Sequence, residues 1–241
     1  MPAQSRQKFT IILFLYLPLF FLNFGSLAQT ANEDKKQGKL IFEAQFSKPL
    51  QTKIWKSEID PVLYSSVFTR KGKLIIDTGG GVTVWLDKVL AGDIKIEYDW
   101  TVLVDSGKND RLSDLNQFWM ASDPGNKNLF TRKGKFEEYD SLSLYYVGFG
   151  GNTNTTTRFR KYYGNGQKPL IKEYLDTDHL LKANKTYHIS ITVMNGTTSF
   201  FVDGVLYFEY ADPKPLTNGY FGFRSTAARH AIDNFKVFQL N

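Results

Sequence analysis

Arginine and tyrosine alternate along a short segment in the middle of the chain, and such a segment could bind an acidic group. Residues 156–163 read TTRFRKYY, and in an extended strand every second side chain lies on the same face. Arg158, Arg160 and Tyr162 would then share one face. Because a guanidinium presents a planar fork of donors that fits a carboxylate, this face predicts a carboxylate site. A solvated strand face held by salt bridges is the alternative.

β-Elimination from a uronate is the chemistry that this face could support. One group must neutralise the carboxylate, a second must remove the proton at C5, and a third must protonate the oxygen that leaves C4. We predict that Arg158 and Arg160 hold the carboxylate. Tyr162 or Tyr146 would transfer the proton, with the pKa of the phenol lowered by a nearby arginine. A lyase would expel a sugar and a dehydratase would expel water, and the sequence leaves both open.

Histidines could take part in the same proton transfer. His179 lies in a loop, LDTDHLL, and is the predicted catalytic histidine. We expect His188 to be structural, because it follows Tyr187 in a core strand, and His230 to lie at the surface or in a turn.

An aromatic and amide-rich segment, NQFWMASDP, could bind sugar rings and hydroxyl groups. Trp119 would stack on a sugar ring or, alternatively, anchor a loop against the sheet. The predicted substrate-binding residues are Trp119, Asn116, Gln117, Tyr145 and Asn152.

Glycoside hydrolysis would require two carboxyl groups that flank the scissile bond. Glu137, Glu138 and Asp140 are the candidates in a charged loop segment. Glu97 and Asp99 share one strand face, which a solvated exterior explains equally well.

The sequence shows no ligand spacing typical of a metal site. The three histidines are scattered, without the spacing of a zinc site, and there is no cysteine. Asp105, Asn109 and Asp110 could hold a structural calcium, although they lack an EF-hand pattern. We predict no cofactor.

The elements that must position these residues are strands. Residues 142–163 predict a hairpin with a Gly/Asn-rich turn at 150–154, and 94–104 alternate as a half-buried strand. Asp203-Gly204 predicts a second tight hairpin, whereas residues 105–140 read as an irregular excursion. No helix of three turns is visible. We therefore predict an all-β fold, an antiparallel two-sheet β-sandwich of the jelly-roll type.

Several segments resemble a known superfamily. The run TYHISITVMNGTTSFFVDGVLYFEY, with NGYFGFRS and AIDNFKVFQL, resembles concanavalin-A-like lectin/glucanase jelly rolls. NQFWMASDP and YYVGFGGNTNTTTRFRKY are similar to small secreted bacterial jelly rolls of polysaccharide-utilisation gene clusters. That resemblance implies a carbohydrate-active protein, and some such proteins are lyases or dehydratases of uronate glycans such as ulvan, alginate or pectin. The Q-I-H and R-x-E-x-R motifs of alginate-lyase jelly rolls are not present.

The N-terminus predicts export. Arg6 and Lys8 precede an apolar run at 11–24, and the small residues of Ser26-Leu27-Ala28 follow at the cleavage position, so residues 1–28 read as a signal peptide. Residues 29–37 would be a flexible leader and 38–241 the jelly-roll domain. We expect a secreted or periplasmic protein with no membrane span after cleavage. Without the two signal cations, 28 basic and 24 acidic residues give a net charge of +4, with no polybasic tract for nucleic acid.

Together these features predict a secreted enzyme that degrades an acidic oligosaccharide or polysaccharide by β-elimination. A non-catalytic carbohydrate-binding protein would need only an aromatic platform. A glycoside hydrolase of the concanavalin-like fold is the other alternative.

Overall fold

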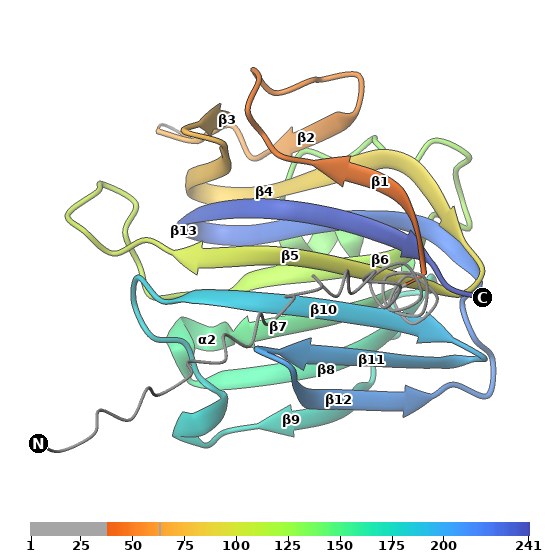
Figure 1. Cartoon of the computed structure of the whole chain (residues 1–241). Coiled ribbons are helices and arrows are strands. Elements are labelled where there is room, and N and C mark those ends of the chain that lie inside the picture. The colour runs from red at the N-terminus through yellow and green to blue at the C-terminus, as the bar shows by residue number, and fades with distance from the viewer. Residues whose placement is uncertain (1–37, 63) are drawn as a thin grey trace, which may run out of the picture. The chain divides into compact units, whose positions relative to one another are not determined.

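A computed structural model describes residues 38–62 and 64–241 (Figure 1), and the expected signal peptide and leader lie outside the described residues. The helical segments that it describes are short: α2 (Gly151–Asn154) and two 3-10 turns, Phe136–Tyr139 and Thr177–His179. Within 38–62 and 64–241 no helix is long and apolar enough to cross a membrane. The strands are β1 (Lys39–Ala44), β2 (Trp55–Ile59), β3 (Ser66–Arg70), β4 (Lys73–Ala91), β5 (Ile94–Val102), β6 (Leu115–Ser122), β7 (Ser143–Gly150), β8 (Thr156–Tyr163), β9 (Leu170–Tyr174), β10 (Thr186–Met194), β11 (Thr197–Val202), β12 (Val205–Ala211) and β13 (Asn218–Gln239).

All strand pairs are antiparallel, and two long strands, β4 and β13, take part in both layers of a jelly roll (Figure 1). Residues 218–226 of β13 lie between β4 and β6, whereas residues 228–232 lie between β4 and β5. We call the layer β2-β4-β13-β6-β7-β8-β9 the site sheet and the layer β3-β4-β13-β5-β10-β11-β12 the back sheet. The predicted all-β antiparallel sandwich is confirmed. The sequence predicts separate strands on either side of residues 79–81 and 225–231, but the chain stays extended through both stretches.

The main core fills the space between the two sheets with aromatic side chains. Trp119 of β6 stacks on Phe159 of β8, with ring centroids 5.9 Å apart and planes within 6°. Phe159 in turn packs against Phe208 of β12, and Trp100 of β5 meets Phe149 of β7 edge to face. These contacts fix which faces of β6, β7 and β8 lie inward and therefore which side chains point outward.

The excursion predicted for residues 105–140 contains a strand, so that prediction is wrong in part. β6 lies in the middle of the site sheet between β13 and β7, and seven of its eight residues are buried. Its outer face is covered by residues 123–142, which add Leu129 and Tyr139 to a second apolar cluster with Trp85 and Phe118. Because both faces of β6 are covered, its sequence lacks the alternation of a half-solvated strand.

Arg132 fixes this covering segment. Its guanidinium pairs with Asp123 at 2.7 Å and donates to the carbonyl oxygens of Glu138 and Leu129 and to the hydroxyl of Ser141. The Arg132 and Asp123 side chains are each only 9% exposed. Residues 123–142, which we call the covering loop, are therefore an ordered part of the domain.

Candidate functional site

A pocket of about 400 Å³ opens on the outer face of the site sheet, next to the covering loop. The strands β7 and β8 contribute its central part, the α2 turn closes one end, and Phe136 of the covering loop stands on another side. Its lining is Arg111, Ser113, Asp114, Asn116, Phe136, Tyr146, Gly148, Gly151, Asn152, Thr153, Thr156, Arg158, Arg160, Tyr162, Lys168 and Thr226. The volume is within the range of about 300–1,000 Å³ that small-molecule sites occupy.

The β7–β8 hairpin and β6 together bring six of the predicted site residues into this pocket, five from the hairpin and one from β6. Tyr146 is opposite Arg160 in the register, and Gly148 is opposite Arg158. The turn between the strands uses left-handed backbone at Asn152, Thr153 and Asn154, with φ of 52°, 58° and 59°, and asparagine tolerates this conformation. The six that line the pocket are Arg158, Arg160, Tyr162, Tyr146, Asn116 and Asn152.

A glycine on β7 creates room for the central phenol. Tyr146 donates its hydroxyl hydrogen to Oδ1 of Asn116 at 2.8 Å. Gly148 lies two residues further along the same strand face, and a Cβ at that position would overlap the Tyr146 hydroxyl and come within 2.8 Å of Asn116 Oδ1. Only glycine therefore lets the Tyr146 hydroxyl reach Asn116 across the strand.

Cations dominate the charged groups of the lining: Arg111, Arg158, Arg160 and Lys168 face a single carboxyl group, that of Asp114. Arg158 forms an ion pair with Glu173 of β9, and Lys168 pairs with Asp140 at 2.6 Å. An excess of positive charge in a concave site favours an anionic ligand.

Two of these cations have no carboxylate within 4 Å among the described residues: Arg160 and Arg111. Arg160 donates to the carbonyl oxygen of Lys168 at 2.8 Å. Arg111 donates to the Ser113 hydroxyl at 2.6 Å and to the carbonyl oxygen of Thr226 at 3.0 Å. Arg160 fits the predicted role of a carboxylate ligand better than Arg158, whose charge is already compensated.

Burial sets the protonation of the acidic groups in the pocket. It raises the pKa of Tyr146 well above its ordinary value and also raises the pKa of Tyr162, although Arg160 and Arg224 act in the opposite direction on both. The expected lowering of the phenol pKa is therefore reversed. Burial likewise raises the pKa of Asp114, while a hydrogen bond from Ser113 and the charge of Arg111 oppose the rise.

A fully buried arginine lies next to the pocket. Arg224 of β13 donates to the carbonyl oxygen of Gly134, and its guanidinium carbon lies 5.1 Å from the ring centroids of both Phe136 and Tyr139. Burial lowers its pKa. These contacts with the covering loop make Arg224 a link between the sheet and the wall of the pocket.

Three predicted substrate-binding residues face the core and not the pocket: Trp119, Gln117 and Tyr145. Trp119 and Gln117 are fully buried, and the Trp119 indole donates to the Thr198 hydroxyl at 2.9 Å. Tyr145 donates to Asp212 at 2.5 Å on the same inner side. Because side chains alternate along β6 and β7, Asn116 and Tyr146 point outward while their neighbours point inward.

The histidines also differ from expectation. His179 stacks on Tyr174 at 3.7 Å and pairs with Asp176 at 2.6 Å, and it does not line the pocket. The side chain of His188, predicted to be structural, is half exposed and bonds to Asp99. His230, predicted at the surface, is fully buried, and desolvation lowers its pKa to about 3.

The carboxylates that hydrolysis would need do not meet in the pocket. Glu138 accepts from backbone N–H groups of the covering loop, and Asp140 is held by Lys168. Glu97 and Asp99 belong to the back sheet. The possible calcium ligand Asp110 accepts from Arg229 and from the N–H groups of Asp105 and Gly107.

Ten of the sixteen lining residues were not predicted as site residues, among them Arg111, Asp114 and Gly148. Arg111 and Asp114 precede β6, in the stretch read as an irregular loop, and nothing in their spacing marks them. Gly148 had a usable signal, since Tyr146, Gly148 and Gly150 alternate along one strand face.

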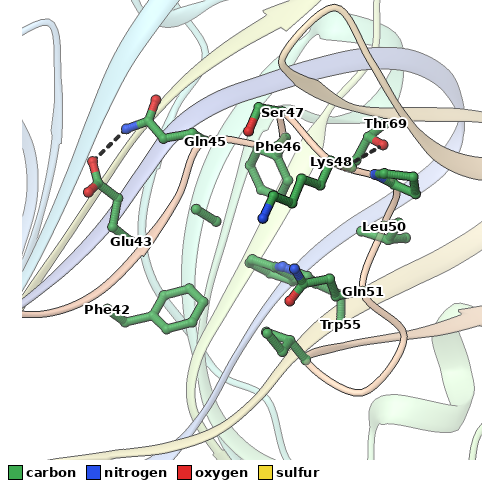
Figure 2. A pocket seen from close by; sticks show the side chains of 13 residues that line it. Phe42, Glu43, Gln45, Phe46, Ser47, Lys48, Leu50, Gln51, Trp55 and Thr69 are labelled. Carbon is green, nitrogen blue, oxygen red and sulfur yellow. Dashed lines mark hydrogen bonds between the residues drawn. The ribbon is translucent and has the colours of Figure 1, made fainter.

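A second hollow, of about 170 Å³, lies between β1 and β2 (Figure 2). Phe42, Phe46 and Trp55 form its apolar part, and Figure 2 shows the amide of Gln45 turned toward the carboxylate of Glu43. The Thr69 hydroxyl donates to the carbonyl oxygen of Lys48. This hollow is smaller than the pocket of the site sheet, which is therefore the stronger candidate.

A comparison with protein families assigns the chain to a family. The sequence pattern of the family described as "Domain of unknown function (DUF6250)" matches residues 76–235. The chain belongs to this family. The DUF6250 match runs from β4 to β13 and includes every residue that lines the pocket. No match to a curated protein sequence is found.

Solved structures share the jelly-roll fold of this DUF6250 protein at low sequence identity. A protein of unknown function with a galectin-like fold from Bacillus subtilis is 17% identical over 84% of this chain and 97% of its own, with a TM-score of 0.69. An endo-β-1,3-glucanase from Pyrococcus furiosus is 11% identical over 83% of this chain and 94% of its own, with a TM-score of 0.59. The carbohydrate-binding module CBM66 from Bacillus subtilis is 17% identical over 77% of this chain and 96% of its own, with a TM-score of 0.54.

Proposed function

We propose that this protein binds a carboxylate-bearing glycan in the pocket of the site sheet and cleaves it by β-elimination. The observation that carries the proposal is the charge of the lining, in which Arg160 and Arg111 have no carboxylate partner among the described residues, while Arg158 and Lys168 are paired with Glu173 and Asp140. A retaining or inverting hydrolase needs two carboxyl groups, and the described lining offers only Asp114. The jelly-roll neighbours that act on or bind carbohydrate are consistent with a glycan ligand.

Arg160 is the ligand for the uronate carboxylate in this proposal. It extends into the pocket without a carboxylate partner among the described residues, so its fork of donors is available. Neutralising the carboxylate stabilises the negative charge that develops when the C5 proton leaves. Arg158 contributes positive charge but remains in its ion pair with Glu173.

Proton transfer is divided between Asp114 and the tyrosines. A carboxylate with a raised pKa is a stronger base near neutral pH, so Asp114 accepts the C5 proton. The electron pair forms the C4–C5 double bond, and the bond from C4 to its oxygen breaks. Tyr146 or Tyr162, whose raised pKa keeps the phenol protonated, donates the proton that the leaving oxygen takes. A departing sugar makes the protein a lyase, and departing water makes it a dehydratase.

Incubation with polyuronates and their oligosaccharides tests this function. Elimination produces a 4,5-unsaturated uronate that absorbs in the far ultraviolet, and Arg160→Lys should lower kcat as well as raise KM because the bidentate geometry is lost. The cost expected for losing one such donor set is about 2–4 kcal/mol in transition-state stabilisation. Arg158→Lys is the matched control, since its charge is compensated and its loss should cost less.

The pH dependence follows from the sign of the Asp114 shift. Asp114 must be ionised to act as base, so kcat/KM should fall as the pH drops through its raised pKa, and Asp114→Asn should remove activity. New reducing ends without ultraviolet absorbance would show a hydrolase instead. Saturable binding without either product would show a carbohydrate-binding protein.

A further inference from the structure

We propose that Arg111 forms a second anion site in the same pocket, so that the natural ligand carries two anionic groups on neighbouring sugars. The inference rests on the proposed function and specifies its substrate class. It assigns a role to a cation that the elimination chemistry does not use.

Arg111 is poised to bind an anion. Its Nη2 donates to the Ser113 hydroxyl and the Thr226 carbonyl, both neutral acceptors. Its Nε is buried and has no hydrogen-bond partner in the described structure. A buried donor without a partner carries a free-energy cost, so the groups around Arg111 do not fully satisfy its guanidinium.

The carboxyl groups near Arg111 form no ion pair with it within 4 Å among the described residues. Asp110, its neighbour in sequence, is held by the guanidinium of Arg229 at 2.8 Å. Asp114, the proposed base, accepts a hydrogen bond from the Ser113 hydroxyl at 3.0 Å. Arg111 therefore adds positive charge to the part of the pocket that is lined by the segment before β6.

Arg111 and Arg160 belong to different walls. Asn116 of β6, Gly148 of β7 and Arg158 of β8 lie in one row across the sheet, and two strand spacings place the outer two backbones about 10 Å apart. Arg160 is on the β8 side of that row and Arg111 is on the β6 side. One carboxylate is matched by one guanidinium, so two guanidinium groups from different segments suit two oxyanions on adjacent sugars.

A sulfate ester and a carboxylate both offer oxygens that match a guanidinium fork. Three disaccharides with the same backbone distinguish them. The first carries one uronate carboxylate, the second adds a sulfate ester on the neighbouring sugar, and the third adds a carboxylate there.

Calorimetric titration of the wild-type protein with these three disaccharides is the test. The matching second anion should raise affinity about tenfold, the gain that one charge-assisted contact provides. Arg111→Gln should abolish that gain while leaving affinity for the singly charged disaccharide within about twofold. Arg160→Gln should weaken all three, and Lys127→Gln, which removes an exposed charge of the covering loop, should weaken none.

Equal wild-type affinity for all three disaccharides would overturn the second site and leave the proposed function intact. Equal weakening of all three in Arg111→Gln would assign Arg111 to the first carboxylate and would also overturn it. Failure of all three to bind to folded wild-type protein would overturn the proposed function itself. If Arg111→Gln does not fold, the wild-type comparison still decides.

Discussion

At the scale of single residues, the site depends on a glycine that carries no functional group. Gly148 leaves the space in which the Tyr146 hydroxyl reaches Asn116. The position is buried on the pocket side of β7, and the ring of Tyr146 packs against Phe118 and Tyr162. A methyl group at residue 148 therefore has to displace the phenol or the amide.

Gly148→Ala is expected to lower turnover about as much as Tyr146→Phe, because both remove the same oriented hydroxyl. The double variant should then be little worse than either single variant, since residues that act as one unit are not additive. Steady-state kinetics on the elimination assay measures this, with far-ultraviolet circular dichroism as the check on folding. Full additivity of the two losses would contradict the proposed contact.

At the scale of elements, the hairpin is the part that the sequence predicted best. Alternation in TTRFRKYY correctly placed Arg158, Arg160 and Tyr162 on one face, and the Gly/Asn turn correctly joined β7 to β8. Alternation is informative there because one face of β8 is packed and the other borders the pocket.

The neighbouring strand β6 escaped prediction for a physical reason. The covering loop buries the outer face of Leu115–Ser122, so polar and apolar residues do not alternate. Without the strand, Gln117 could not be assigned to a face, and for Trp119 the sequence left open whether it stacks on a sugar or anchors against the sheet. Arg111 and Asp114 depend on the same tertiary contact, because only the position of β6 brings the preceding residues to the pocket.

The covering loop itself supports a prediction about stability. Arg132→Met should lower the free energy of unfolding by about 1–3 kcal/mol, because it removes the ion pair with the partly buried Asp123 and the hydrogen bonds to Glu138, Leu129 and Ser141. Urea unfolding measures the change, and hydrogen exchange should show faster opening of residues 123–142. The exposed Lys127 of the same loop provides the control, since Lys127→Met should change stability by no more than about 0.5 kcal/mol. An unchanged unfolding midpoint in Arg132→Met would mean that the loop is held by its aromatic contacts alone.

At the scale of the whole domain, the covering loop divides the outer face of the site sheet into two parts. Over β4, β13 and the Phe118 end of β6 that face is filled, since Trp85 and Phe118 are fully buried beneath the loop. Over β7 and β8 it borders the pocket. Phe136 marks the boundary, because it lines the pocket and packs 5.9 Å from Tyr146.

A long polysaccharide laid across these strands would collide with the loop at Phe136, so we predict that the protein acts on chain ends. The mass of a polyuronate, followed by size-exclusion chromatography, should then stay high while small unsaturated products accumulate. A fluorophore on the reducing end of an oligosaccharide identifies the bound terminus, because blocking that terminus should abolish turnover and blocking the other should not. A rapid fall in polymer mass at low product yield would mean that the chain crosses the sheet despite the loop, and that Phe136 moves aside to admit it.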